Sequence, residues 1–125
     1  MTSAAAESIS IAAVETSVKD AVASGRICPP VNVRLHWQAG PDASGVQRAM
    51  TEALRLTGSI LELSDPTVRN RSIESGRLLH ALVRDERGRS GLISVAAGTP
   101  ATLALTVYGN HGVIRLDETP CEQDG

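Results

Sequence analysis

Arg34 and His36 are two chemically capable side chains placed two residues apart in one alternating segment. In VNVRLHWQAG (31–40) every second residue from Val31 is apolar, which is typical of a strand with one buried face. Residues two apart on a strand project to the same side, about 7 Å apart at Cα. Histidine transfers protons near neutral pH, and a fixed guanidinium binds a carboxylate or enolate. We therefore take Arg34 and His36 as candidate catalytic residues; the alternative is a solvated or interfacial strand face.

A second candidate pair is His80 and Tyr108. The alternation of segments 77–85 and 102–108 places both on the same sheet face, where tyrosine can orient or donate a proton and histidine can accept one. The alternative is packing in a dimer interface with a satisfied imidazole. We expect Trp37, Gln38 and Thr106 to line the ligand-binding site.

The stretch GNHG (109–112) raises the question of a catalytic loop. Its two glycines permit a positive φ and Asn110 tolerates one, so a tight turn explains the residues without any function for His111. We therefore interpret it as a hairpin turn.

Other chemistries find little support. The three histidines and two cysteines show no metal-ligand spacing, the acidic residues do not pair at a catalytic spacing, and no G-x-S-x-G is present. A net charge of −2 and only two aromatic residues give no reason to expect nucleic-acid binding. No apolar run reaches the ~20 residues of a membrane span. Cys28 and Cys121 stand alone, which favours a reducing, cytoplasmic setting.

The elements that must position these residues follow from periodicity. Residues 5–24 predict a helix that ends at Gly25, and residues 44–58 predict a second helix with a Ser44–Gln47 capping box and an end at Gly58. Strands are predicted at 31–40, 60–63, 77–85, 91–97, 102–108 and 113–117. Residues 65–76 read as a polar loop with room for a short strand around Val68.

This order predicts an α+β fold with a single mixed or antiparallel sheet of about six strands and two helices on one face. The chain of 125 residues suits a single domain, 1–125, with 118–125 as a flexible tail. Alternation divides the late strands into two faces. The aliphatic face, expected under the helices, carries Leu79, Ala81, Val83, Ile93, Val95, Leu103, Leu105 and Val107. The mixed face carries His80, Leu82, Ser94, Ala96, Ala104, Thr106 and Tyr108. Two helices cannot cover both faces, so we expect the open face to serve a dimer or a ligand.

The sequence resembles the C-terminal, substrate-binding domain of the Gfo/Idh/MocA oxidoreductases over roughly residues 22–118. SGRICPPVNVRLHW is similar to the G-x-I-G-x-P turn of that family entering a strand, and ALRLTGS is similar to its DLLRWLTG helix. RGRSGLISVAAGTPATLALTVYGNHGVIRLDE looks like its closing strands. The resemblance implies the α+β fold and a dimer formed sheet to sheet.

Departures from the family pattern bear on the activity. The chain lacks the G-x-G-x-x-G that precedes this domain in the family, and Lys19 does not match the family's catalytic lysine motif. Where the family helix carries H-x-x-x-D or H-x-x-D, this chain has Arg48 and Thr51. We therefore expect no cofactor and no hydride transfer by this chain alone.

Two functions of different classes remain open. One is a free-standing enzyme or binder that acts without a cofactor on a small molecule, of the cyclase or isomerase type and possible in natural-product biosynthesis. Its rate would come from holding one reactive conformer of the ligand. The other is a non-catalytic partner or oligomerisation subunit of a separate Rossmann-bearing oxidoreductase. We also expect a homodimer through the open face, with no nucleic-acid or membrane partner. A stable homodimer that captures no separate chain would count against the second function.

Overall fold

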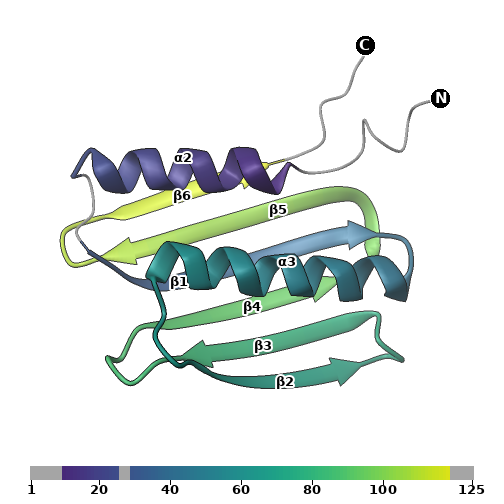
Figure 1. Cartoon of the computed structure of the whole chain (residues 1–125). Coiled ribbons are helices and arrows are strands. Elements are labelled where there is room, and N and C mark those ends of the chain that lie inside the picture. The colour runs from purple at the N-terminus through teal and green to yellow at the C-terminus, as the bar shows by residue number, and fades with distance from the viewer. Residues whose placement is uncertain (1–9, 26–28, 119–125) are drawn as a thin grey trace, which may run out of the picture.

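The computed structural model describes residues 10–25 and 29–118 and contains two helices beside one sheet (Figure 1). The elements in chain order are α2 (Ile11–Ala23), β1 (Pro30–Gly40), α3 (Ala43–Leu61), β2 (Thr67–Ile73), β3 (Leu78–Arg84), β4 (Ser90–Ala96), β5 (Gly98–Gly109) and β6 (Val113–Glu118).

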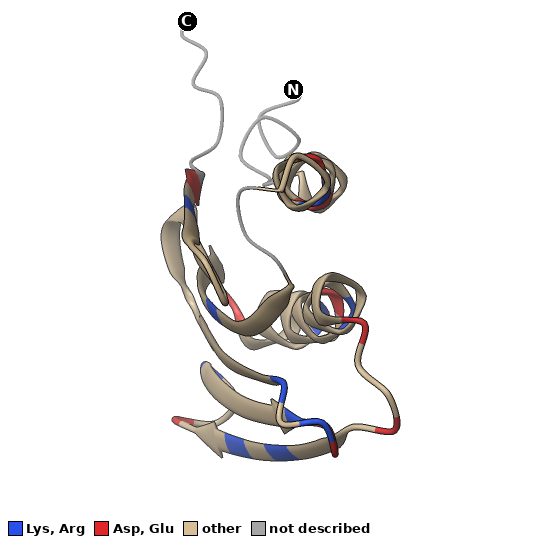
Figure 2. Ribbon diagram, turned by 90° about the vertical axis from the view of Figure 1, so that its left-hand side faces the viewer, with Lys and Arg blue, Asp and Glu red and all other residues tan. Residues whose placement is uncertain are grey.

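The six strands form one mixed sheet in the order β2-β3-β4-β1-β5-β6. β1 and β4 pair in parallel at the centre, and every other neighbouring pair is antiparallel. Both helices lie on the same side of the sheet and leave the opposite side uncovered (Figures 1 and 2). The predicted α+β fold, with two helices on one face of a six-stranded sheet, is confirmed.

The core lies between the helices and the aliphatic face of the sheet. The residues predicted for this face are all buried: Leu79, Ala81, Val83, Ile93, Val95, Leu103, Leu105 and Val107. The helices contribute a matching apolar stripe of Val14, Val18, Val46, Ala49, Met50, Ala53, Leu56, Ile60 and Leu61. Packing against the helices buries these side chains, so they are not available to a ligand. Neither α2 nor α3 combines the length and apolarity needed to cross a bilayer.

Helix α3 is longer than the sequence predicted. Its N-cap is Asp42, whose carboxylate accepts the Gly45 N–H at 2.9 Å, so the predicted Ser44–Gln47 capping box is wrong. The helix passes through Gly58 and ends at Leu61, and Glu62 takes the left-handed cap conformation with φ 52°. The predicted strand at 60–63 is therefore also wrong, because Ile60 and Leu61 extend the buried helical stripe.

The sixth strand comes instead from the segment predicted as a polar loop. The short strand allowed around Val68 is confirmed and extends over the whole of β2, where all seven residues are exposed. Helix α2 begins at Ile11 behind the Ser10 cap; the predicted helix residues 5–9 lie outside the described residues, as do residues 119–125 of the predicted tail.

The turns show one confirmed detail and one difference. Gly25 has φ 84° and its N–H donates to Val22 O, as predicted for the helix end. The 109–112 turn exists, closed by the Gly109 N–H bonded to Gly112 O at 2.8 Å, but neither glycine has a positive φ. Asn110 and His111 are exposed at its tip.

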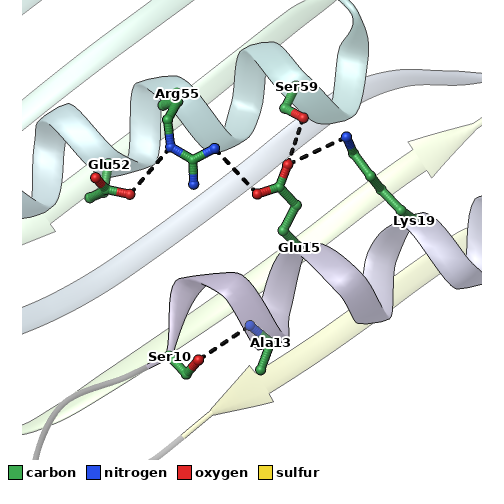
Figure 3. A network of polar contacts seen from close by, with 7 residues as sticks. All are labelled: Ser10, Ala13, Glu15, Lys19, Glu52, Arg55 and Ser59. Carbon is green, nitrogen blue, oxygen red and sulfur yellow. Dashed lines mark hydrogen bonds and ion pairs between the residues drawn. The ribbon is translucent and has the colours of Figure 1, made fainter.

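A polar cluster joins α2 to α3 (Figure 3). The carboxylate of Glu15 accepts from the Ser59 hydroxyl at 2.7 Å, and its oxygens lie 3.3 Å from Arg55 Nη1 and 3.4 Å from Lys19 Nζ. The Ser59 hydrogen bond is the largest cause that holds the pKa of Glu15 below its usual value, and the two cations add to it. This cluster fixes α2 on α3, with Arg55 also bound by Glu52 of the same helix.

The β3–β4 hairpin is fastened to the end of α3 through Asp85. Its buried carboxylate accepts the backbone N–H groups of Arg87, Arg89 and Ser64. Burial works against ionisation, but the hydrogen bonds from Arg89, Ser64 and Arg87 outweigh it and keep the pKa of Asp85 lowered. The guanidinium groups of Arg87 and Arg89 donate to the carbonyls of Glu62 and Leu61, which α3 leaves free at its end.

Candidate functional site

The strand register arranges the open face in rows that cross the sheet. One row runs Arg69, Leu82, Leu92, Arg34, Thr106, Arg115, from β2 at one edge to β6 at the other. The next row runs Arg71, His80, Ser94, His36, Ala104, Asp117. These two rows contain three of the four residues predicted to be catalytic.

A hollow of about 290 Å³ opens at the middle of these rows. Its lining comes from four strands: Arg34, Leu35, His36, His80, Leu92, Ser94, Ala104 and Thr106. The floor is low because Ser94 and Ala104, the short side chains of their row, alternate with the long imidazoles of His80 and His36. The hollow thus arises from a tall–short–tall–short order across the sheet.

Arg34, His36, His80 and Thr106 are therefore brought to one place. Arg34 and His36 are neighbours on β1, and Thr106 lies directly opposite Arg34 on β5. His80 lies two strands from His36 in the same row, about 10 Å away at Cα from the usual strand spacing, with Ser94 between them. A molecule seated over Ser94 can contact both imidazoles and the guanidinium.

Three predicted site residues lie elsewhere. Tyr108 is on the open face as predicted, but it pairs with Asn32 at the end of the sheet, roughly 20 Å from His80 by strand spacing and rise. Trp37 faces the helices and is 8% exposed, so it does not line the hollow. Gln38 is on the open face, but its amide donates to Pro100 O at 2.6 Å and its side chain lies against Gly98. The prediction that Tyr108, Trp37 and Gln38 share a site with the other candidates is therefore corrected: none of the three lines the hollow.

Leu35, Leu92, Ser94 and Ala104 complete the lining and were not predicted as site residues. Strand alternation assigned Ser94 and Ala104 to the mixed face, but alternation does not say which residues of different strands lie side by side. That information resides in the register, which depends on how the six strands pair. Among the described residues, no ion pair or side-chain hydrogen bond engages Arg34, His36 or His80, so their polar atoms are free to meet a ligand.

A second hollow lies on the helix side of the sheet, with a volume of about 430 Å³. Trp37, Arg48 and Glu52 line it together with Ile11 of α2 and small residues from β1 and α3. Its polar residues are the arginine and glutamate of one exposed helical turn, and it has neither histidine nor tyrosine. Within residues 10–25 and 29–118, no three His, Cys, Asp or Glu side chains come together in either hollow or elsewhere as a metal site would require.

The fold is shared with solved dehydrogenase structures. A probable dehydrogenase from Thermotoga maritima superposes with a TM-score of 0.70 and 15% identity over 87% of this chain and 39% of its own. A putative myo-inositol dehydrogenase from Sinorhizobium meliloti gives 0.66 and 14% over 81% of this chain and 37% of its own. A scyllo-inositol dehydrogenase from Lactobacillus casei, solved with NAD(H) and scyllo-inositol, gives 0.61 and 14%, covering 82% and 38%.

These matches concern the fold. The chain spans less than two fifths of the length of the dehydrogenases that it resembles. No protein-family model and no curated protein sequence matches it. The resemblance to the C-terminal domain of the Gfo/Idh/MocA oxidoreductases, inferred from short sequence motifs, is therefore confirmed as a shared fold: the chain has the architecture found in part of those inositol dehydrogenases.

Proposed function

We propose that the open-face hollow binds a small, partly apolar molecule that carries a carboxylate or a polarised carbonyl, and that the chain acts on it without a cofactor. The observation that carries the proposal is the convergence of Arg34, His36 and His80 on one hollow of about 290 Å³. Leu92 and Ala104 supply apolar wall and floor beside these polar groups, the usual composition of a small-molecule site.

The chemistry that suits this arrangement is proton transfer within a held conformer. Arg34 binds the anionic oxygen, one imidazole accepts a proton from carbon or a hydroxyl, and the other returns a proton to the far side of the ligand. The separation of about 10 Å between His36 and His80 leaves room for the ligand between them. An isomerisation or cyclisation of this kind moves protons and bonds but no net electrons, so it needs no redox cofactor. We place the proposed reaction in natural-product biosynthesis, where cyclisations and isomerisations of this kind occur.

Amide chemical shifts test this proposal. The ¹⁵N-labelled protein is titrated with a set of small aromatic and aliphatic carboxylates, and the expected shifts centre on Arg34, His36, Ser94 and Ala104. Arg34→Met should weaken binding about tenfold or more, because a charged hydrogen bond is lost. The matched control is Arg115→Met, an arginine of the same row that does not line the hollow. If both variants weaken carboxylate binding equally, the effect comes from the overall positive charge of the sheet, and the site at Arg34 is refuted.

A second candidate function is that of a partner or oligomerisation subunit. The observation that favours it is the pair Leu82 and Leu92, which lie opposite each other on the open face and are 41% and 43% exposed. Exposed leucines in contact with each other are typical of an interaction surface. The predicted homodimer is tested by sedimentation equilibrium, and a monomer at every concentration would contradict it. A stable homodimer that captures no separate chain would count against the partner role. The expected cytoplasmic setting stays part of the proposal for both functions.

A further inference from the structure

The open face of β2, β3, β4 and β1 carries charge of one sign. Arg34, Arg69, Arg71 and Arg84 lie on it, as do His36 and His80, and this four-strand area contains no aspartate or glutamate. The whole chain has a net charge of −2. Acidic residues of the described chain lie instead on the helices, in loops and at the end of β6, where Asp117 is on the open face and Glu118 follows it. The basic bands of β2 are visible at the lower edge of the sheet in Figure 2.

The four arginines are free of internal partners in the part of the chain that the structure describes. The ion pairs found there use Lys19, Arg55, Arg87 and Arg89, which belong to the helix cluster and the hairpin fastening. No hydrogen bond of the described residues uses the guanidinium groups of Arg69, Arg71 or Arg84. These guanidinium groups therefore take no part in the ion pairs and hydrogen bonds that hold the described fold, and they raise the local positive potential.

Apolar side chains are interspersed with the arginines. Leu82 lies between Arg69 and Leu92 in its row, and Ile73 stands at the end of β2 with 37% of its surface exposed. Each of the four strands presents four residues on the open face. From strand spacing and rise per residue, these cover about 500 Å² in projection, which is the scale of a small, transient protein interface. A leucine centre with an arginine rim has the composition of such an interface.

We propose that this surface docks a different protein, whose contacting patch combines carboxylates with apolar side chains. The proposal deepens the second candidate function and rests on it. A second copy of this chain fits less well, because both surfaces of a face-to-face dimer are basic, and Asp117 is the one acidic residue on the open face of the described strands. A nucleic acid also fits poorly, since this area carries no aromatic side chain on which bases could stack.

Peptide titrations test the docking surface directly. The probes are a synthetic amphipathic peptide of glutamates and leucines, the same peptide with serines for leucines, the same peptide with lysines for glutamates, and a single-stranded oligo-dT. The glutamate–leucine peptide should shift the amides of Arg69, Arg71 and Leu82, and its affinity should fall as salt is added. Arg69→Gln or Arg71→Gln should each weaken it about threefold to tenfold, and Leu82→Ser about as much. Arg48→Gln, on the helix side, should leave it unchanged.

Each other outcome contradicts the proposal. Equal binding of the serine peptide or of oligo-dT would mean general attraction of polyanions, and no saturable shift would mean no docking surface. A stable dimer whose contacts include Arg69 and Leu82 would give the surface to a second copy. None of Arg69, Arg71 and Leu82 lines the hollow. If no carboxylate binds in the hollow but the glutamate–leucine peptide binds, the first proposed function alone is contradicted. If a carboxylate binds in the hollow but the peptide does not bind, the docking surface alone is contradicted.

Discussion

His36 of β1 and His80 of β3 face the same side of the sheet in one register row, with the short side chain of Ser94 between them. This relationship creates the hollow, because two imidazoles rise on either side of a serine. The depth of the hollow therefore depends on the small residues of the row as well as on the histidines beside them.

Filling the floor of the hollow should abolish ligand binding without loss of stability. Ala104 is an exposed floor residue between His36 and Asp117, so Ala104→Leu places a larger side chain in the hollow. The expected result is that carboxylate binding falls at least about tenfold, with the unfolding midpoint little changed. Thr102→Leu is the control, since Thr102 lies on the same strand and face but does not line the hollow. Binding that survives Ala104→Leu would place the ligand elsewhere.

Gly91 of β4 should resist replacement by alanine. A Cβ at this position would stand 2.5 Å from the γ-methyl of Thr57 in α3, which is too close for the present backbone positions. Gly91→Ala should lower the free energy of unfolding by about 1–3 kcal/mol. Thr57→Ala in the same chain should recover part of this loss, which urea unfolding followed by Trp37 fluorescence can measure. Additive losses in the double variant would show that the two residues do not interact.

Thr57 itself offers a stabilising change. Its hydroxyl is buried without a hydrogen-bond partner among the described residues. Thr57→Val keeps the shape and removes the unsatisfied group, so the free energy of unfolding should rise by about 1 kcal/mol. A decrease on thermal or urea unfolding would contradict the assignment, and would point to a bonded water at that hydroxyl.

Asp85 should make stability depend on pH in a defined direction. The folded protein holds its pKa below the ordinary value of 3.8, so the carboxylate stabilises the fold fully above that value. The contribution is lost as the pH falls through the lowered pKa. Asp85→Asn should therefore be less stable than the parent near pH 7, and the gap should narrow towards about pH 2. Glu15 and Asp42, whose pKa values are also lowered, affect both proteins alike. A gap that stays constant with pH would assign the loss to packing.

The Glu15 cluster should control how firmly α2 is docked. Glu15→Gln removes the charge that binds Arg55 and Lys19, so amide hydrogen exchange should quicken in α2 while β4 and β1 stay protected. The global loss should be below about 1 kcal/mol, since the cations are half-exposed. Glu52→Gln is the control because Glu52 pairs with Arg55 within α3 alone. Equal exchange in both variants would deny the cluster a docking role.

The sequence predicted the fold class and the two sheet faces well, because alternation depends only on neighbours along the chain. It failed at the end of α3, where Gly58 suggested a stop but Ile60 and Leu61 had core contacts to gain. It also placed a loop at β2, whose strand is stabilised by pairing with β3 rather than by burial. For the candidate site, too, the sequence predicted what depends on neighbours along the chain and missed what depends on strand pairing. His80 and His36 were found by residue type and face, whereas the separation of Tyr108 from them is set by strand register.

The most direct measurement is a crystal structure of the protein, in its solution assembly, with a carboxylate from the titration set bound. The account predicts the carboxylate within hydrogen-bonding distance of the Arg34 guanidinium, with the body of the molecule over Ser94 and Ala104 between the two imidazoles. A structure in which a flat subunit interface covers Arg34, His36 and His80 and leaves no hollow would contradict it.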